Sequence, residues 1–281
     1  MLKTRIITAV VLLALLLPAL FYPAPWPFCA LTLLLIAAGA WEWGRLNGLT
    51  QQGSWALGLV CVLLCALSWA GGWLARPLPL LWTLAGSLWV LMGAWLLRAG
   101  VSGWPRIPRV LRVVGGLAAL WLAWLAVAQA RVIGINFLLS VVLLVWVADI
   151  AAYFAGRAFG TRIVKVKLAP AISPGKSWEG VWGGMLGVLL LAFAWVWADA
   201  NLSLGAPSLY SRLATRGWAF LVLAGLFMAA MSVVGDLVES LIKRSAGVKD
   251  SSGLLPGHGG VLDRVDALLP ALPLALMLSS L

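Results

Sequence analysis

Charged residues are scarce in this sequence. Only 10% of its 281 residues are Asp, Glu, Lys or Arg, whereas 63% are hydrophobic, and the mean hydropathy is +1.03. An average soluble domain has roughly 25% charged residues. The 20 basic and 9 acidic residues cannot cover the surface of a soluble protein of this length. The composition therefore excludes an ordinary soluble protein and predicts that lipid covers most of the surface.

Cysteine and histidine are also rare. The chain has three cysteines, Cys29, Cys61 and Cys65, and a single histidine, His258. The cysteines lie in apolar runs without a C-x-x-C pair, so we exclude a disulfide framework and a zinc site and interpret them as small buried residues. Because the chain is so apolar, we assign its net charge of +11 to contacts with the membrane and expect no nucleic acid partner.

Long apolar runs, each near the roughly 20 residues that a membrane-crossing helix needs, recur along the chain. We expect an all-α, polytopic integral membrane protein with about nine transmembrane helices. The first run has a basic flank but no cleavage pattern, so it is expected to remain as an uncleaved span. The expected spans are Ile6–Tyr22, Pro27–Arg45, Trp55–Leu74, Leu78–Leu97, Val113–Ala130, Ile135–Ala155, Val181–Ala198, Trp218–Ser240 and Val261–Leu281.

Basic residues are distributed unevenly between the two sides that these spans define. The side of the N-terminus holds fifteen of them, and the opposite side holds four, Arg76, Arg131, Arg212 and Arg216. This positive-inside bias predicts a cytoplasmic N-terminus and cytoplasmic connections at 157–177 and 243–260, with the C-terminus outside. The ninth span has only residues 267–281 free of charge, so we expect it to be short, tilted or re-entrant.

Acidic residues gather around the last two expected spans. Asp236, Glu239 and Lys243 are spaced to share one face of a helix near its cytoplasmic end, and Asp263 and Asp266 begin the last span. A glycine-rich loop joins the two groups and could bring them together. Ionisable residues in or beside spans are costly and are functional candidates by default. The spacing therefore predicts a shared carboxylate site at the cytoplasmic interface.

Carboxylates beside Lys and Arg suit Mg²⁺ better than zinc, because Mg²⁺ prefers oxygen ligands and often shares them with substrate phosphates. Lys243, Arg244, Lys249 and Arg264 would offset the remaining phosphate charge. A simpler interpretation makes the basic residues topology signals and lipid anchors, and Asp236 with Glu239 an ion pair or a proton-coupling site. The density of charge between residues 249 and 266 favours phosphoryl or nucleotidyl chemistry.

The segment Ser240–Asp266 also has a recognisable pattern, S-x-x-K-R-x4-K-D-x-S-x-x-L-P-G-H-G-G-V-L-D-R-V-D. It closely resembles the signature of the phosphatidate cytidylyltransferases, the CDP-diacylglycerol synthases. Residues 148–157 and 173–180 resemble the family as well, although Ile150 stands where the family often has a hydroxyl residue. We see no internal repeat, and we expect one membrane domain over 1–281, with an apolar N-terminal half at 1–135 and a catalytic half at 136–281.

The resemblance implies transfer of a cytidylyl group from CTP to phosphatidic acid, with Mg²⁺ as cofactor and release of pyrophosphate. It implies Asp236 and Asp263 as metal ligands, and Glu239 and Asp266 are further candidates. Lys243 and Arg264 complete the catalytic set that we expect with Asp236 and Asp263. The residues expected to bind substrate are Ser173, Lys176, Arg244, Lys249, Asp250, His258, Gly259 and Gly260. Which basic residue receives which phosphate stays open.

Partners and location follow from the same reasoning. We expect CTP, phosphatidic acid and the lipid bilayer as partners, consider a homodimer, and favour a bacterial inner membrane. Two alternatives stay open. One is an enzyme that uses another lipid phosphate or a CTP-dependent lipid kinase. The other is a transporter that couples ions through Asp236 and Glu239, for which an internal repeat would be expected.

Overall fold

The apolar runs form helices because a backbone in lipid must satisfy its own hydrogen bonds. The computed structural model describes residues 2–202 and 204–281, and these ranges contain helices and no strands. The elements, in order, are α1 (Leu2–Phe21), α2 (Trp26–Leu46), α3 (Gln51–Ala70), α4 (Pro79–Ala99), the 3₁₀ helix η1 (Val101–Arg106), α5 (Arg109–Ile133), α6 (Ile135–Phe159), α7 (Trp178–Asn201), α8 (Leu209–Ala214), α9 (Trp218–Ser245), α10 (Leu262–Val265) and α11 (Leu268–Ser280).

Eight of these helices are long and apolar enough to cross a membrane: α1 to α7 and α9. They confirm the first eight expected spans and the all-α polytopic fold, and the chain is an integral membrane protein. Large apolar side chains such as Leu80 and Leu91 are about 70% exposed on the outside of the bundle, where lipid would cover them. Cys29, Cys61 and Cys65 are free thiols buried in the core, as expected.

The ninth expected segment does not form one long helix. It is divided into α10 and α11, and the 13 residues of α11 give a length of about 20 Å, too short for a hydrocarbon core of about 30 Å. The charged Asp263 and Asp266 stand at the start of the segment and take part in the polar cluster described below. Helix α11 instead packs inside the bundle against α4, α5 and α9, in agreement with the expectation of a short segment.

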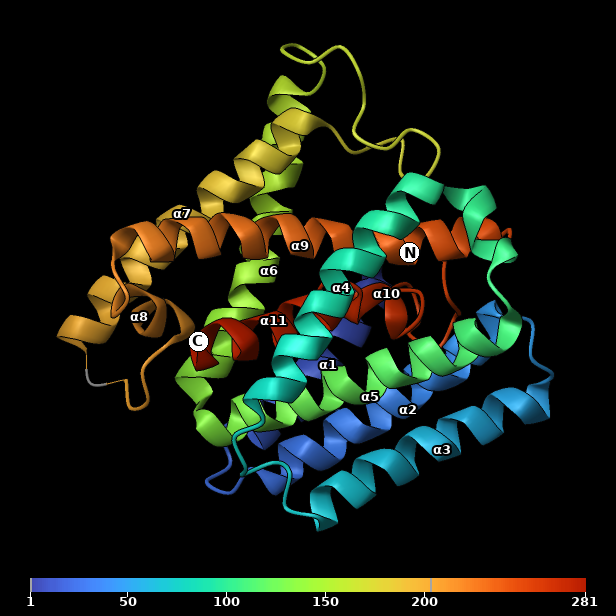
Figure 1. Cartoon of the computed structure of the whole chain (residues 1–281), viewed down its shortest axis with the longest axis horizontal. Helices are drawn as coiled ribbons and strands as arrows, with labels where there is room; N and C mark the ends of the chain where they lie inside the picture. The colour runs from blue at the N-terminus through green and yellow to red at the C-terminus, as the bar shows by residue number, and fades with distance from the viewer. Residues whose placement is uncertain (1, 203) are drawn as a thin grey trace.

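Helices α6 and α7 pack with their backbones close together. A side-chain carbon at Gly183 would lie 2.2 Å from Ala155 Cβ, and one at Gly184 would lie 2.8 Å from the carbonyl oxygen of Ala148. Small residues permit this close approach between membrane helices. Figure 1 shows the α6–α7 pair extending to the top of the view, with the connecting loop above it, while α2, α3 and α5 lie side by side below. The packing fixes the position at which α7 begins.

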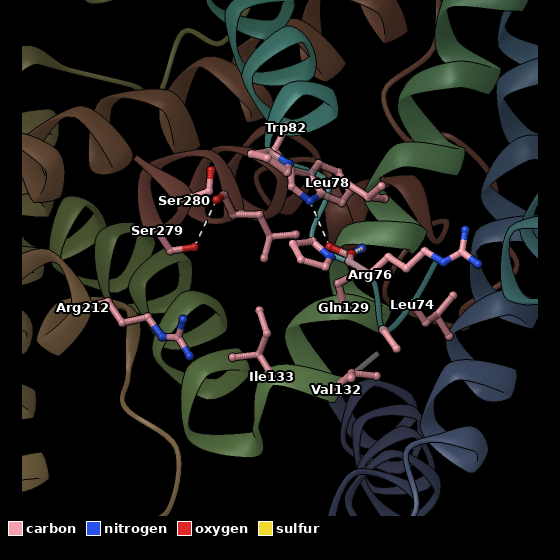
Figure 2. A pocket seen from close by; sticks show the side chains of 14 residues that line it. Leu74, Arg76, Leu78, Trp82, Gln129, Val132, Ile133, Arg212, Ser279 and Ser280 are labelled. Carbon is pink, nitrogen blue, oxygen red and sulfur yellow. Dashed lines mark hydrogen bonds between the residues drawn. The ribbon is translucent and has the colours of Figure 1, made fainter. Parts of the chain in front are cut away.

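The polar contacts lie at two opposite ends of the bundle. At one end, which we call the signature end, the C-terminal ends of α2 and α9 contact α10, and the turn before α7 contacts α9. At the other end, α4, α5, α8 and α11 surround a cavity of about 450 Å³. Figure 2 shows Arg76 and Arg212 on opposite sides of that cavity. The described residues that line it all lie outside Ser240–Asp266.

Candidate active site

Lys243 stands at the centre of the signature end. Its Nζ lies 2.5 Å from Glu239 Oε2, one helical turn earlier on α9, and 2.5 Å from Asp263 Oδ1 on α10. All three side chains are nearly buried, with exposed fractions of 12%, 5% and 6%. An ammonium group has three donors, so two hold the carboxylates and one stays free for another acceptor. Glu239 and Asp263, one from each predicted acidic group, therefore lie close together with Lys243 between them.

Asp263 also holds the loop between α9 and α10, residues 246–261, which we call the signature loop. Its Oδ2 accepts hydrogen bonds from the Ser251 and Gly260 backbone N–H groups at 2.9 and 2.7 Å, and from the Ser251 hydroxyl at 2.9 Å. Burial alone would raise the pKa of Asp263, but Lys243 and the backbone donors outweigh it and hold the pKa below its ordinary value. Asp263 is thus an ionised anchor.

A second ion pair joins α9 to the turn before α7. Lys176 Nζ lies 2.6 Å from Asp236 Oδ2, and the Ser240 hydroxyl lies 3.2 Å from Asp236 Oδ1. The turn is shaped by the backbone of Ser173, whose carbonyl oxygen accepts from the Lys176 N–H at 3.2 Å. Ser177 then caps α7 by accepting from the Gly180 N–H. Two segments that resemble the family separately therefore meet in one place.

The α6–α7 loop is ordered by a buried carboxylate. Glu179 Oε1 accepts hydrogen bonds from the backbone N–H groups of Ile163 and Val164 at 3.0 and 2.9 Å. This contact folds the basic stretch of the loop onto the first turn of α7, next to Lys176.

Asp266 lies near the Lys176–Asp236 pair. It lies between α10 and α11, outside the eight candidate spans, where α9 approaches so closely that a side-chain carbon at Gly235 would lie 2.6 Å from the Asp266 carbonyl oxygen. Burial raises the pKa of Asp266 to about 7, and the negative charges of Asp236 and Asp149 add to this effect. The carboxyl groups of Asp266 and Asp149 thus lie near the Lys176–Asp236 pair.

A polar cavity of about 510 Å³ lies between the signature loop and the start of α1. Its wall includes Arg5 from α1 and the predicted residues Lys249, Asp250, His258, Gly259 and Arg264. A side-chain carbon at Gly259 would lie 2.7 Å from Asp263 Oδ2, so the cavity wall touches the anchor residue itself. Within the described part of the chain, His258 Nδ1 has no hydrogen-bond partner. The cavity offers cationic and donor groups to an anion.

Three predicted residues have other surroundings. Arg244 Nε and one terminal nitrogen lie 3.4 and 3.5 Å from the carbonyl oxygens of Ile172 and Val248, so its guanidinium ties two loops together. Ser173 contributes backbone contacts to its turn. Gly260, near the end of the signature loop, is buried. None of these three lines the polar cavity as the structure describes it.

Glu42 was not among the predicted site residues. It lies on α2 and is fully buried. Its carboxylate accepts hydrogen bonds from the Val261 and Leu262 N–H groups and from the Ser252 hydroxyl, and it shares the single proton of the Ser251 hydroxyl with Asp263. The available signal was a lone carboxylate in an otherwise apolar span. Arg5, on the cavity wall, was likewise assigned only to topology. The N-terminal half therefore takes part in the site.

Comparisons with known proteins show the family of this chain. The model of a family described as "Cytidylyltransferase family" matches residues 3–281. A protein of Pseudomonas aeruginosa named phosphatidate cytidylyltransferase is 43% identical, over 97% of this chain and 95% of its own length. Proteins with the same name from Haemophilus influenzae and Brucella suis are 38% and 36% identical, over 97% and 96% of this chain and 96% and 90% of their own lengths. The chain belongs to the cytidylyltransferase family.

Proposed function

We propose that this protein transfers the cytidylyl group of CTP to phosphatidic acid. An oxygen of the lipid phosphate attacks the α-phosphorus of CTP and forms a new P–O bond. The bond from that phosphorus to the oxygen bridging the α- and β-phosphates breaks, and pyrophosphate leaves with the bonding electron pair. The products are CDP-diacylglycerol and pyrophosphate. The family match over residues 3–281 supports this reaction.

The observation that carries the proposal is the position of the 510 Å³ cavity beside Lys243 and Asp263. Its volume is in the range of small-molecule sites, about 300–1,000 Å³. Arg5, Lys249 and Arg264 line it, and Gly259 separates it from Asp263 by a single backbone segment. A triphosphate in this cavity would place its charge against cations and its reacting phosphorus next to the Lys243 cluster.

The residues can act by positioning and by neutralising charge. The lipid phosphate is already anionic at neutral pH, so no activated serine or cysteine is required. Lys243, held by two carboxylates, can donate its free N–H to a phosphate oxygen, and Lys176 can donate two that Asp236 leaves free. Fixed donors of this kind stabilise the charge that develops as pyrophosphate departs.

Mg²⁺ is part of the proposal, and the donor set fits it. Among residues 2–202 and 204–281, no group of three or more His, Cys, Asp or Glu side chains forms a closed metal site. Mg²⁺ commonly uses one or two carboxylates together with substrate phosphates. Asp236 and Asp263 would supply such carboxylates, and Glu239 and Asp266 are further candidates beside them. When bound, the metal would neutralise phosphate charge.

We further propose that the signature end faces the cytoplasm of a bacterial inner membrane. Fifteen basic residues on the side of the N-terminus against four on the other support this orientation. The first helix also reaches the signature loop, because the Thr8 hydroxyl donates to the Pro256 carbonyl oxygen at 2.9 Å. CTP would enter from the cytoplasm, and phosphatidic acid would remain in the adjoining leaflet.

The experiment is an acceptor panel. Protein purified in detergent is incubated with CTP, Mg²⁺ and one lipid at a time: phosphatidic acid, diacylglycerol, or a polyprenyl phosphate, with product masses read by mass spectrometry. We expect CDP-diacylglycerol from phosphatidic acid and no product from diacylglycerol. Phosphorylation of diacylglycerol, or a CDP-linked product from the polyprenyl phosphate alone, would overturn the proposal.

A further inference from the structure

The carboxylate of Glu42 makes contacts that its position in an apolar helix does not lead one to expect. Oε2 accepts from the Ser251 hydroxyl at 3.2 Å and from the Leu262 N–H at 2.8 Å. Oε1 accepts from the Ser252 hydroxyl at 2.5 Å and from the Val261 N–H at 2.9 Å. The donors are more than 200 residues away in the sequence. All four donors belong to the segment Ser240–Asp266, which carries the family signature.

These contacts join both ends of the signature loop. Ser251 and Ser252 lie soon after α9, whereas Val261 and Leu262 open α10. A carboxylate has about four acceptor sites. On Glu42, three of them take separate donors from this segment, and the fourth shares the Ser251 proton with Asp263. Because Glu42 is fully buried, losing these donors would leave a carboxylate without compensation. The arrangement favours one closed shape of the loop over open ones.

Glu42 is also linked to Asp263 through a single side chain, Ser251. The Ser251 hydroxyl oxygen lies 3.2 Å from Glu42 Oε2 and 2.9 Å from Asp263 Oδ2, so the two carboxylates lie on either side of one hydroxyl. Gly260, which donates its N–H to Asp263, has no room for a side chain, since a Cβ would lie 2.3 Å from Glu42 Oε1. The position of Asp263 is therefore set against Glu42.

We propose that Glu42 is a positioning residue for cytidylyl transfer: it closes the signature loop and so holds Asp263 and, through it, Lys243 beside the polar cavity. The inference rests on the proposed function of that cavity. It gives the apolar N-terminal half a part in the reaction, because α2 supplies the surface on which the catalytic loop is folded.

The test compares Glu42→Gln and Glu42→Ala with Asp199→Asn as a matched control. Asp199 is another carboxylate that accepts several hydrogen bonds, from Asn136, Ser208 and Ser211, but it lies at the opposite end of the bundle. Loss of a supporting residue behind a reacting site commonly costs about 10–100-fold in activity. We expect kcat to fall about 10-fold in Glu42→Gln and about 100-fold in Glu42→Ala, and to stay within twofold in Asp199→Asn.

A second readout separates positioning from general loss of structure. Amide hydrogen exchange should rise in residues 251–262 of the Glu42 variants, while exchange in α6 and α7 stays as in the wild type. This measurement needs no turnover, so it tests the inference even if the wild type proves inactive and the proposed function fails. Unchanged exchange in residues 251–262, or kcat within twofold of wild type in Glu42→Ala, would overturn the proposal, as would a uniform rise of exchange throughout the protein.

Discussion

Replacing Lys243 by Met removes the cation that two buried carboxylates share. Glu239 and Asp263 would then lie close together without a positive charge between them, both about 95% removed from solvent. Removing one partner of a buried ion pair costs about 3–5 kcal/mol. With about 2–4 °C per kcal/mol for a protein of this size, we expect the Tm to fall by about 10 °C. We also expect activity to be abolished, since this removes the cation that we propose donates to a substrate phosphate.

The assay can use the protein's own thiols. Cys29, Cys61 and Cys65 are free and buried, so a thiol-reactive fluorophore reports their exposure as the detergent-solubilised protein unfolds. Lys165→Met is the matched control, because Lys165 is exposed in the α6–α7 loop and forms no salt bridge within the described chain. Its Tm should stay within 2 °C of wild type, which is the range expected of a surface change below about 0.5 kcal/mol.

A double variant tests the cause of the destabilisation. Lys243→Met combined with Glu239→Gln leaves only Asp263 charged, and Asp263 Oδ2 keeps its three donors from Ser251 and Gly260. The double variant should recover about half of the lost Tm but no activity. The reasoning is refuted if Lys243→Met unfolds at the wild-type temperature, or if the double variant is less stable than Lys243→Met alone.

Three further predictions follow from the same site. Gly260→Ala should lose activity by at least about 100-fold, because its Cβ would lie 2.1 Å from Ser251 Oγ. The control is Gly115→Ala, which should match the wild type because a Cβ at Gly115 meets no atom within 4 Å. Equal activities of the two variants would contradict this prediction. Glu179→Gln should weaken the hold on the Ile163 and Val164 N–H groups and speed tryptic cleavage within residues 160–177; an unchanged digestion rate would count against that role. Chelation of metal ions with EDTA should stop turnover, and added Mg²⁺ should restore it. Turnover that persists in EDTA would contradict a requirement for Mg²⁺.

The helices could be predicted from the sequence because hydropathy is a local signal. Eight of the nine expected segments are spans in the structure. The last segment differs because its apolar residues favour a membrane span, whereas its two aspartates favour a polar environment. Residues 267–281 are apolar enough for a span, but Asp263 and Asp266 are drawn into the polar cluster, which leaves 13 residues for α11.

The site could be predicted in part. Helical spacing placed Glu239 and Lys243 one turn apart, and their contact is confirmed. The pairing of Lys176 with Asp236 could not be derived from spacing, because the two residues lie on separate elements whose relative position depends on the packing of α7 against α9. Each was a candidate by itself, from the resemblance to the family.

Glu42 shows where sequence reasoning stops. Its partners lie 209 to 220 residues further along the chain, and no period or motif joins two segments at that distance. Arg244 stays a predicted phosphate ligand. The residue is exposed, and its guanidinium lies 3.4 and 3.5 Å from the carbonyl oxygens of Ile172 and Val248, contacts that its place in the signature did not indicate.

The most direct test of the central claim follows the label of CTP. Purified protein with phosphatidic acid and Mg²⁺ is given CTP labelled at either the α- or the γ-phosphorus, and the lipid fraction is counted, with Asp263→Asn as the inactive control. Cytidylyl transfer predicts that the α-label enters the lipid and the γ-label leaves as pyrophosphate, with no incorporation by the variant. Incorporation of the γ-label, or of neither label by the wild type, would contradict the account.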